Sequence, residues 1–150
     1  SWEEYFMELA KLTAKRSKDP NTQVGACIVN KENKVVGLGY NGFVNIPDND
    51  DIFPWSKKEK PTDKFEDTKF AYVVHAEANA ILNAISGTKD CILYVTLYPC
   101  YECTKLIIQS GIKKVIYLDY KADEASKRMF KAANIEVIHY NNDKNKEVKL

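Results

Sequence analysis

The first stretch of the chain places apolar residues at the spacing of an amphipathic helix. Trp2, Phe6, Leu9 and Thr13 follow one another at steps of four, three and four residues, so they share one helical face. A run of turn-forming residues follows Arg16 and should end this helix. The pattern therefore predicts a helix near the start of the chain.

Two short apolar runs rich in β-branched residues come next. They cover residues 24–30 and 35–40 and flank the polar residues 31–34, a pattern typical of a β-hairpin. Residues 42–69 show no sustained period and contain three prolines. Loops of this length are usually functional or mobile. The alternative is a disordered insertion without a role, but its aromatic side chains argue against complete disorder.

The second half of the chain alternates helical and strand patterns. The predicted helices span residues 75–85, 100–110 and 123–133, and the predicted strands span residues 92–97, 114–118 and 135–140. Such alternation favours right-handed crossovers and a partly parallel sheet. Because the hairpin adds antiparallel strands, we expect an α/β fold with a mixed sheet. We expect one domain over residues 1–150, with a polar, frayed tail at 141–150.

Composition narrows the class of protein. Hydrophobic residues make up 45% of the 150 residues and charged residues 29%, which excludes an intrinsically disordered chain. No window approaches the roughly 18 consecutive apolar residues of a membrane-spanning helix. The first residues lack the basic start and apolar run of a signal peptide, so we expect a cytoplasmic protein. A net charge of +1 gives no general attraction to nucleic acid or to a membrane surface.

The four cysteines divide into two kinds. Cys100 and Cys103 form a Cys-x-x-Cys pair, whereas Cys27 and Cys91 lie within apolar runs. Without a secretory context, a disulfide framework is a poor explanation. We interpret the pair as functional residues of a chemical site and the other two cysteines as buried core residues.

One histidine and the cysteine pair have the composition of a catalytic zinc site. Such sites take three protein ligands and leave the fourth position to water. His75, Cys100 and Cys103 supply three ligands, while His139, the second histidine, belongs to the last predicted strand. A structural site would usually be closed by a fourth ligand, so the set favours catalysis.

Glu77 lies two residues after the histidine, in the first turn of a predicted helix. There it can face metal-bound water and act as general acid and base. Alternatively, it only complements the dipole of the helix. Both segments of the site begin predicted helices, whose N-termini favour negative charge and lower the pKa of a thiol such as Cys100.

The spacing His-x-Glu…Pro-Cys-x-x-Cys is the signature of the zinc nucleobase deaminases. Further segments resemble the deoxycytidylate (dCMP) deaminase family, and the resemblance covers roughly residues 2–140. These segments are Ser17-Lys18-Asp19-Pro20, Gln23-Val24-Gly25-Ala26, Gly39-Tyr40-Asn41-Gly42, His75-Ala76-Glu77-x-Asn79-Ala80-Ile81 and Pro99-Cys100-x-Glu102-Cys103.

The resemblance implies a three-layer α-β-α, cytidine-deaminase-like fold: a five-stranded mixed sheet with helices on both faces. It implies hydrolysis of dCMP to dUMP and ammonia, which supplies dUMP for thymidylate synthesis. Zn²⁺ would be held by His75, Cys100 and Cys103. Glu77 would take a proton from the zinc-bound water and deliver it to N3 of cytosine.

The resemblance also implies residues around the base. The backbone near Ala76 and Leu97 would hold the base edge, and Asn41 would hold the base or the sugar. Tyr117 and Tyr120 lie at the end of the strand predicted over residues 114–118, and both would line the pocket. Alternatively, Tyr117 is an ordinary strand residue.

The phosphate of a nucleotide needs a cationic partner. Arginine binds phosphate through two parallel charge-assisted hydrogen bonds. Arg16 is the arginine nearest to the motifs, so we expect it to bind the phosphate, with Lys18 as the second candidate. Alternatively, both are solvated charges at a helix end.

Members of the resembled family are often hexamers, activated by dCTP and inhibited by dTTP. Their effector site uses a Gly-Tyr-Asn-Gly segment and a divalent cation such as Mg²⁺. Gly39, Tyr40, Asn41 and Gly42 match this segment, although Phe43 stands where the family commonly has proline. We therefore expect a homo-oligomer with a possible effector site here.

Two other functions remain open at this point. A deaminase of tRNA or another nucleic acid shares the zinc motif but should show a basic, aromatic face. A catalytically inactive, zinc-stabilised module that binds nucleotides would have no need of Glu77. A nucleoside deaminase is disfavoured, because that family usually has cysteine at the position of His75. We expect a small nucleotide as the partner, with neither membrane nor nucleic acid.

Overall fold

The computed structural model describes residues 1–57, 60 and 62–141. Its helices are α1 (Trp2–Ala14), α2 (Asn49–Ile52), α3 (Ala76–Asn83), α4 (Tyr101–Gln109) and α5 (Glu124–Ala132), with the 3₁₀ turns η1 (Phe65–Asp67) and η2 (Lys69–Ala71). Its strands are β1 (Gly25–Val29), β2 (Val35–Tyr40), β3 (Gly42–Phe43), β4 (Val73–Val74), β5 (Ile92–Leu97), β6 (Lys114–Asp119) and β7 (Glu136–His139).

Five strands form one mixed sheet in the order β2-β1-β5-β6-β7. Strand β1 pairs antiparallel with β2 and β5, whereas β5, β6 and β7 run parallel. This confirms the expected α/β fold and the five-stranded mixed sheet. The carboxyl ends of the parallel strands meet at one edge, where ligands bind in many sheets of this kind.

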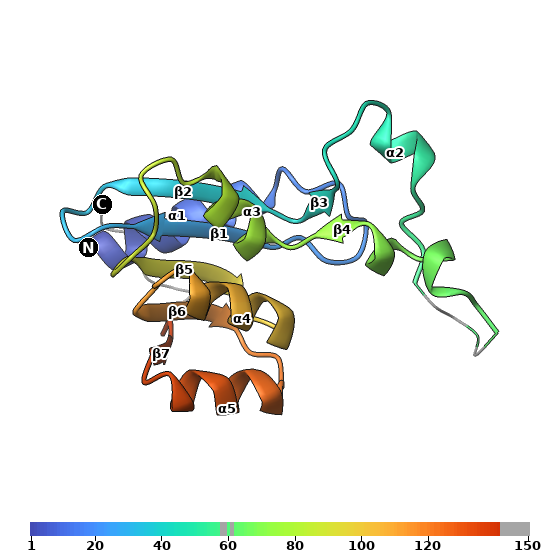
Figure 1. Cartoon of the computed structure of the whole chain (residues 1–150). Helices are drawn as coiled ribbons and strands as arrows, with labels where there is room; N and C mark the ends of the chain where they lie inside the picture. Colours follow the sequence, from blue (N-terminus) through green and yellow to red (C-terminus); the bar gives the residue numbers. More distant parts are fainter. Residues whose placement is uncertain (58–59, 61, 142–150) are drawn as a thin grey trace.

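Helices cover both faces of this sheet (Figure 1). On one face α1 buries Phe6 and Met7 against Cys27 of β1 and Tyr94 of β5. On the other face α3, α4 and α5 contribute Ala80, Ile107 and Phe130, which pack with the inward-facing residues of β1, β5 and β6. Each large apolar side chain buried in this way contributes about 1.5–3 kcal/mol. The three layers agree with the expected architecture.

Helix α3 lies unusually close to β2 because β2 carries a glycine. A Cβ atom on Gly39 would lie 2.3 Å from the backbone nitrogen of Ala80 and 2.4 Å from the carbonyl oxygen of Ala76. Only a residue without a side chain permits this approach. Asn79 then donates a hydrogen bond of 2.8 Å to the carbonyl of Tyr40. These contacts fix the first turn of α3 against the sheet.

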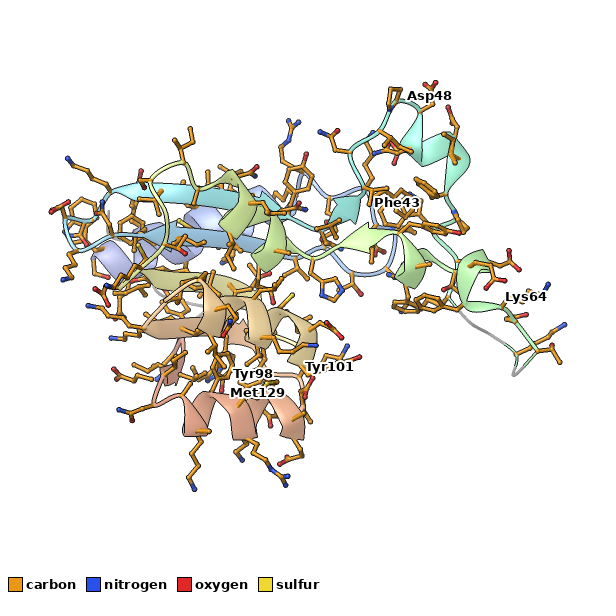
Figure 2. The ribbon with its side chains drawn as sticks, in the orientation of Figure 1. Phe43, Asp48, Lys64, Tyr98, Tyr101 and Met129 are labelled. Atoms are coloured by element: carbon orange, nitrogen blue, oxygen red, sulfur yellow. The ribbon has the colours of Figure 1, made fainter. Side chains whose placement is uncertain are left out.

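The stretch predicted to be irregular contains short elements. Strand β3 pairs antiparallel with β4 in a second, two-stranded sheet, and α2, η1 and η2 lie between them. Aromatic stacking orders the segment. The ring centroid of Phe43, which is labelled in Figure 2, lies 3.8 Å from that of Trp55, and the centroids of Phe53 and Tyr72 lie 4.3 Å apart. Elements of two to four residues are too short to leave a period in the sequence.

The observed ends of the helices in the second half of the chain differ from the predicted ends by one or two residues, because residues near the ends of the predicted ranges are caps rather than helical residues. The helix expected over 75–85 covers Ala76–Asn83, and His75 is its N-cap. Cys27 and Cys91 are buried, as expected of core residues. Among the described residues, none of the helices is long and apolar enough to cross a membrane. The predicted tail lies outside the described residues beyond Asn141.

Candidate active site

Two helix N-termini bring one nitrogen and two sulfur atoms together. His75 is the N-cap of α3, and Cys100 is the N-cap of α4, with Cys103 in the first turn of that helix. The Nδ1 atom of His75 lies 3.4 Å from each of the two Sγ atoms. Strand β5 ends just before α4 begins, so the cluster lies at the carboxyl edge of the parallel strands.

This cluster fits a tetrahedral zinc ion. The three donor atoms of His75, Cys100 and Cys103 lie within 4.8 Å of one another. Zinc bonds of about 2.0–2.1 Å to nitrogen and about 2.3 Å to sulfur place such donors about 3.6 Å apart in tetrahedral geometry. The observed 3.4 Å is close to this spacing. Three ligands leave the fourth position to a water molecule.

The pKa values of the two thiols, Cys100 and Cys103, shift in opposite directions. A hydrogen bond from the Cys103 thiol lowers the pKa of Cys100 to about 4, and bonds from His75 and the backbone N–H of Cys103 act in the same direction against burial. The hydrogen bond to the Cys100 thiolate and burial raise the pKa of Cys103. Cys100 is therefore ready to ligate a cation as thiolate, and a bound cation would replace the proton of Cys103.

Glu77 is buried beside this cluster, in the first turn of α3. Its exposed fraction is 4%, and burial raises the pKa of its carboxyl to about 7. A carboxyl with a pKa near neutrality can both accept and donate a proton at neutral pH. An acid that only complemented the helix dipole could remain in solvent. The burial of Glu77 therefore favours a role in proton transfer.

A cavity of about 230 Å³ opens beside this cluster, and we refer to it as the His75 cavity. Its lining includes Asp19, Thr22, Val24, Asn41, Lys57, Lys69, Phe70, Val73, His75, Ala76, Glu77, Leu97, Tyr98, Cys100 and Lys121. The structure thus brings Ala76, Leu97 and Asn41 together with the cluster. These are the three residues expected around the base.

The side chain of Asn41 is engaged with backbone groups. Its Oδ1 atom accepts a 2.8 Å hydrogen bond from the N–H of Val24, and its Nδ2 atom donates one of 2.8 Å to the carbonyl of Thr22. Its own carbonyl accepts a bond from the hydroxyl of Ser17. Asn41 therefore holds the turn after α1 against the end of β2.

Arg16 and Lys18, expected at the phosphate of the substrate, lie in a different cavity. This Arg16 cavity has a volume of about 410 Å³. Its lining includes Arg16, Lys18, Gly39, Tyr40, Asn41, Gly42, Phe43, Asn45, Asn49, Asp50, Trp55, Asn79 and Asn83. The residues of the expected effector segment thus surround the cavity that contains Arg16. Asn41 lines both cavities.

Three lysines take the place of arginine in the described lining of the His75 cavity. They are Lys57, Lys69 and Lys121, and none was a candidate from the sequence. Lys57 and Lys69 belong to the stretch without a period, so no spacing related them to the motifs. Lys121 comes two residues after β6. Its place at the carboxyl end of a parallel strand was the one available signal.

Tyr117 and Tyr120 lie behind the wall of the cavity. Tyr98, which is labelled in Figure 2, lines the His75 cavity. Its ring centroid is 5.0 Å from that of Tyr117 and 5.4 Å from that of Tyr120. Tyr117 and Tyr120 line a neighbouring hollow with Phe130 of α5. They support Tyr98, which the sequence motifs did not single out.

Comparisons with known proteins agree with this geometry. The family described as "Cytidine and deoxycytidylate deaminase zinc-binding region" matches residues 1–119. A probable deoxycytidylate deaminase of Drosophila melanogaster is 55% identical over 148 residues, which cover 90% of this chain and 70% of that protein. The deoxycytidylate deaminase of Homo sapiens is 56% identical over 129 residues, covering 83% of this chain and 70% of the human protein.

A solved structure has the same fold. The dCMP deaminase of the cyanophage S-TIM5, in complex with dCMP and dUMP, superposes with a TM-score of 0.71 at 24% identity. The match covers 92% of this chain and 96% of the phage protein. At this identity the likeness establishes the shared fold.

Proposed function

The chain belongs to the cytidine and deoxycytidylate deaminase zinc-binding family, and from this premise we propose that it hydrolyses dCMP to dUMP and ammonia. The observation that carries the proposal is the burial of Glu77 beside His75, Cys100 and Cys103 at one cavity. This is the arrangement that a zinc-dependent hydrolytic deaminase requires.

The reaction replaces an amino group by an oxygen atom from water. Zinc held by His75, Cys100 and Cys103 would polarise a water molecule and lower its pKa. A bond forms between the water oxygen and C4 of cytosine, and the bond from C4 to the exocyclic nitrogen breaks. Protons from the water pass to N3 and to the leaving nitrogen, which departs as ammonia.

Glu77 is the residue placed to move these protons. Its carboxyl lies in the same cavity lining as Ala76 and Leu97, whose backbone groups we assign to the edge of the base. The raised pKa of Glu77 lets it take a proton from water and return it to the substrate. General acid–base catalysis of this kind accelerates a reaction by about 10²–10⁴-fold.

Several observations favour a mononucleotide over a nucleic acid as the substrate. The human relative, at 56% identity, is a deoxycytidylate deaminase, and the Drosophila melanogaster relative, at 55% identity, is a probable one. The net charge of +1 gives little general attraction to a polyanion. An inactive nucleotide-binding module would have no use for the buried carboxyl of Glu77.

The test is a deamination assay on the zinc-loaded protein with dCMP, dCTP, deoxycytidine and a tRNA anticodon stem-loop offered separately. Selective conversion of dCMP, read by mass spectrometry, is the expected result. Conversion of the stem-loop with dCMP left intact would instead establish a nucleic-acid deaminase. Inactivity on all four substrates with zinc bound would favour the regulatory module.

We also propose that the Arg16 cavity binds dCTP or dTTP with Mg²⁺. Arg16 and Lys18 supply positive charge, and Asp50, which pairs with Lys18, supplies a carboxylate for a divalent cation. Measuring dCMP turnover against dCTP and dTTP concentration tests this site. Activation by dCTP and inhibition by dTTP are expected, and indifference to both would contradict the proposal.

We also propose that the chain forms a single domain over residues 1–150 and that six copies of the chain assemble into a homohexamer. Its mass in solution, measured by light scattering, tests the assembly. We further propose a cytoplasmic location, because the four free cysteines include the two proposed metal ligands and a reducing compartment keeps such thiols available.

A further inference from the structure

Two lysines give the His75 cavity positive charge that no acidic residue in the described part of the chain balances. Lys57 and Lys121 both line the cavity, and both are exposed. Within residues 1–57, 60 and 62–141, no ion pair or side-chain hydrogen bond involves either ammonium group. Their charges are therefore available to a ligand.

The third lysine in the lining is already compensated. The ammonium of Lys69 pairs with the carboxylate of Asp19, and their side chains are only 5% and 1% exposed. The charges of this buried pair cancel within the cavity wall. Outside the catalytic cluster, the part of the wall that the structure describes consequently carries two uncompensated positive charges, those of Lys57 and Lys121.

The two lysines reach the cavity from separate, supported segments. Lys121 follows the carboxyl end of β6, beside the cluster that follows β5. Lys57 comes two residues after Trp55, whose ring is stacked 3.8 Å from that of Phe43. A phosphate monoester carries about −1.5 to −2 charges at neutral pH, which matches the two ammonium groups.

We propose that Lys121 and Lys57 bind the 5′-phosphate of the substrate and make the enzyme select a nucleoside monophosphate over the nucleoside. The proposal rests on the proposed deamination of dCMP and assigns its phosphate to the His75 cavity rather than to Arg16. Because lysine offers a point charge on a flexible stem, its contacts supply charge recognition rather than a rigid fork.

The first experiment compares kcat/KM for dCMP and for deoxycytidine in Lys121→Gln, Lys57→Gln and the double variant. Loss of one charge-assisted hydrogen bond should lower kcat/KM for dCMP about 10-fold or more, while that for deoxycytidine stays unchanged. Lys121→Arg should retain most of the preference. Equal losses on both substrates, or an unchanged preference for dCMP, would overturn the assignment.

Matched variants separate this site from general effects of charge. Lys113→Gln removes an exposed lysine just before β6, at the opposite end of that strand, and should leave both substrates unaffected. Arg16→Gln should retain the preference for dCMP, since Arg16 lines the other cavity. Loss of the preference in Arg16→Gln alone would move the phosphate to the Arg16 cavity.

A binding measurement keeps the inference independent of turnover. Calorimetry on the zinc-loaded protein should show tighter binding of dUMP than of deoxyuridine, with the difference lost in the Lys57→Gln/Lys121→Gln double variant. If the wild-type protein converts no dCMP, the proposed function fails, yet this difference would still support the phosphate site. Equal binding of dUMP and deoxyuridine by the wild type would overturn it.

Discussion

The Nζ atom of Lys69 lies 2.5 Å from Oδ2 of Asp19, and this buried ion pair forms part of the wall of the His75 cavity. The pair connects the turn after α1 with η2 across 50 positions of sequence. Oδ1 of Asp19 also accepts hydrogen bonds from the N–H groups of Asn21 and Thr22. One carboxylate thereby ties the segment that carries Lys57 and Lys69 to the body of the fold.

Removing this carboxylate should destabilise the protein strongly. Asp19→Ala leaves the ammonium of Lys69 buried without its partner, and losses of about 3–5 kcal/mol are typical of such changes. Urea denaturation of wild type and variant measures the free energy of unfolding. Asp50→Ala is the matched control: it breaks the exposed pair with Lys18 and should cost less than about 1 kcal/mol. Equal losses in the two variants would contradict the role assigned to the buried pair.

The same carboxylate predicts how stability depends on pH. Burial opposes its ionisation, but hydrogen bonds from Lys69 and from the N–H groups of Asn21 and Thr22 outweigh burial and lower the pKa of Asp19. A carboxyl with a lowered pKa in the folded state stabilises the fold fully above its unfolded pKa of about 3.9. This contribution is lost as the pH falls through the folded pKa.

The corresponding measurement is the urea midpoint between about pH 7 and about pH 3. The wild type should lose more stability over this interval than Asp19→Asn, whose amide does not titrate. Parallel curves for the two proteins would show that Asp19 contributes nothing to the acid dependence.

The long elements were predictable because each leaves a pattern along the sequence. The helix around Phe6 turns one face to the core and repeats apolar residues at helical spacing, whereas the strand at 92–97 is buried on both faces and is a continuous run of aliphatic, aromatic and β-branched residues. The segment between Gly42 and Val74 was not predictable. Its order comes from contacts between distant residues, such as the stacking of Phe53 on Tyr72 and the pair of Asp19 with Lys69.

The same distinction applies to the site. His75 and Glu77 are two positions apart, and Cys100 and Cys103 are three positions apart. Each pair lies at the N-terminus of one helix, so local spacing was enough to predict that its two members belong to the same site. Lys57 and Lys121, which we propose to bind the phosphate, had no such local pattern. Arg16 was the natural candidate from its chemistry, yet the turn that follows α1 directs it to the other cavity.

Cysteine variants should separate the metal ligands from the core. Cys100→Ser and Cys103→Ser each remove a thiolate from the three-atom cluster, so both should lose bound zinc, measured by elemental analysis of the purified protein. Cys91→Ser should retain zinc, because Cys91 is buried elsewhere and its pKa is raised chiefly by burial. Zinc retained at wild-type stoichiometry in Cys103→Ser would contradict the ligand set.

Gly39→Ala should displace α3 from the sheet. The added Cβ would meet backbone atoms of Ala76 and Ala80 at 2.4 Å and 2.3 Å, and backbone cannot yield as a flexible side chain does. We expect a loss of stability above the 1–3 kcal/mol typical of overpacking, together with a loss of activity, because α3 carries Glu77.

Gly42→Ala is the matched control for this variant. Its Cβ would find only the ring of Tyr40, at 4.0 Å, so stability should change by less than about 0.5 kcal/mol. Thermal unfolding of the two variants measures the difference. Similar melting temperatures would show that the close approach of α3 to β2 is not required.

The measurement that tests the central claim most directly follows dCMP in ¹⁸O-labelled water with zinc-loaded wild type and Glu77→Gln. The wild type should form dUMP that carries one ¹⁸O atom and release one ammonia for each dUMP. Glu77→Gln should retain zinc while its turnover falls by about 10²–10⁴-fold, and Glu102→Gln, which changes an exposed acid in the first turn of α4, should remain active. Unlabelled product from the wild type, or full turnover by zinc-bound Glu77→Gln, would contradict hydrolytic deamination with Glu77 as the proton carrier.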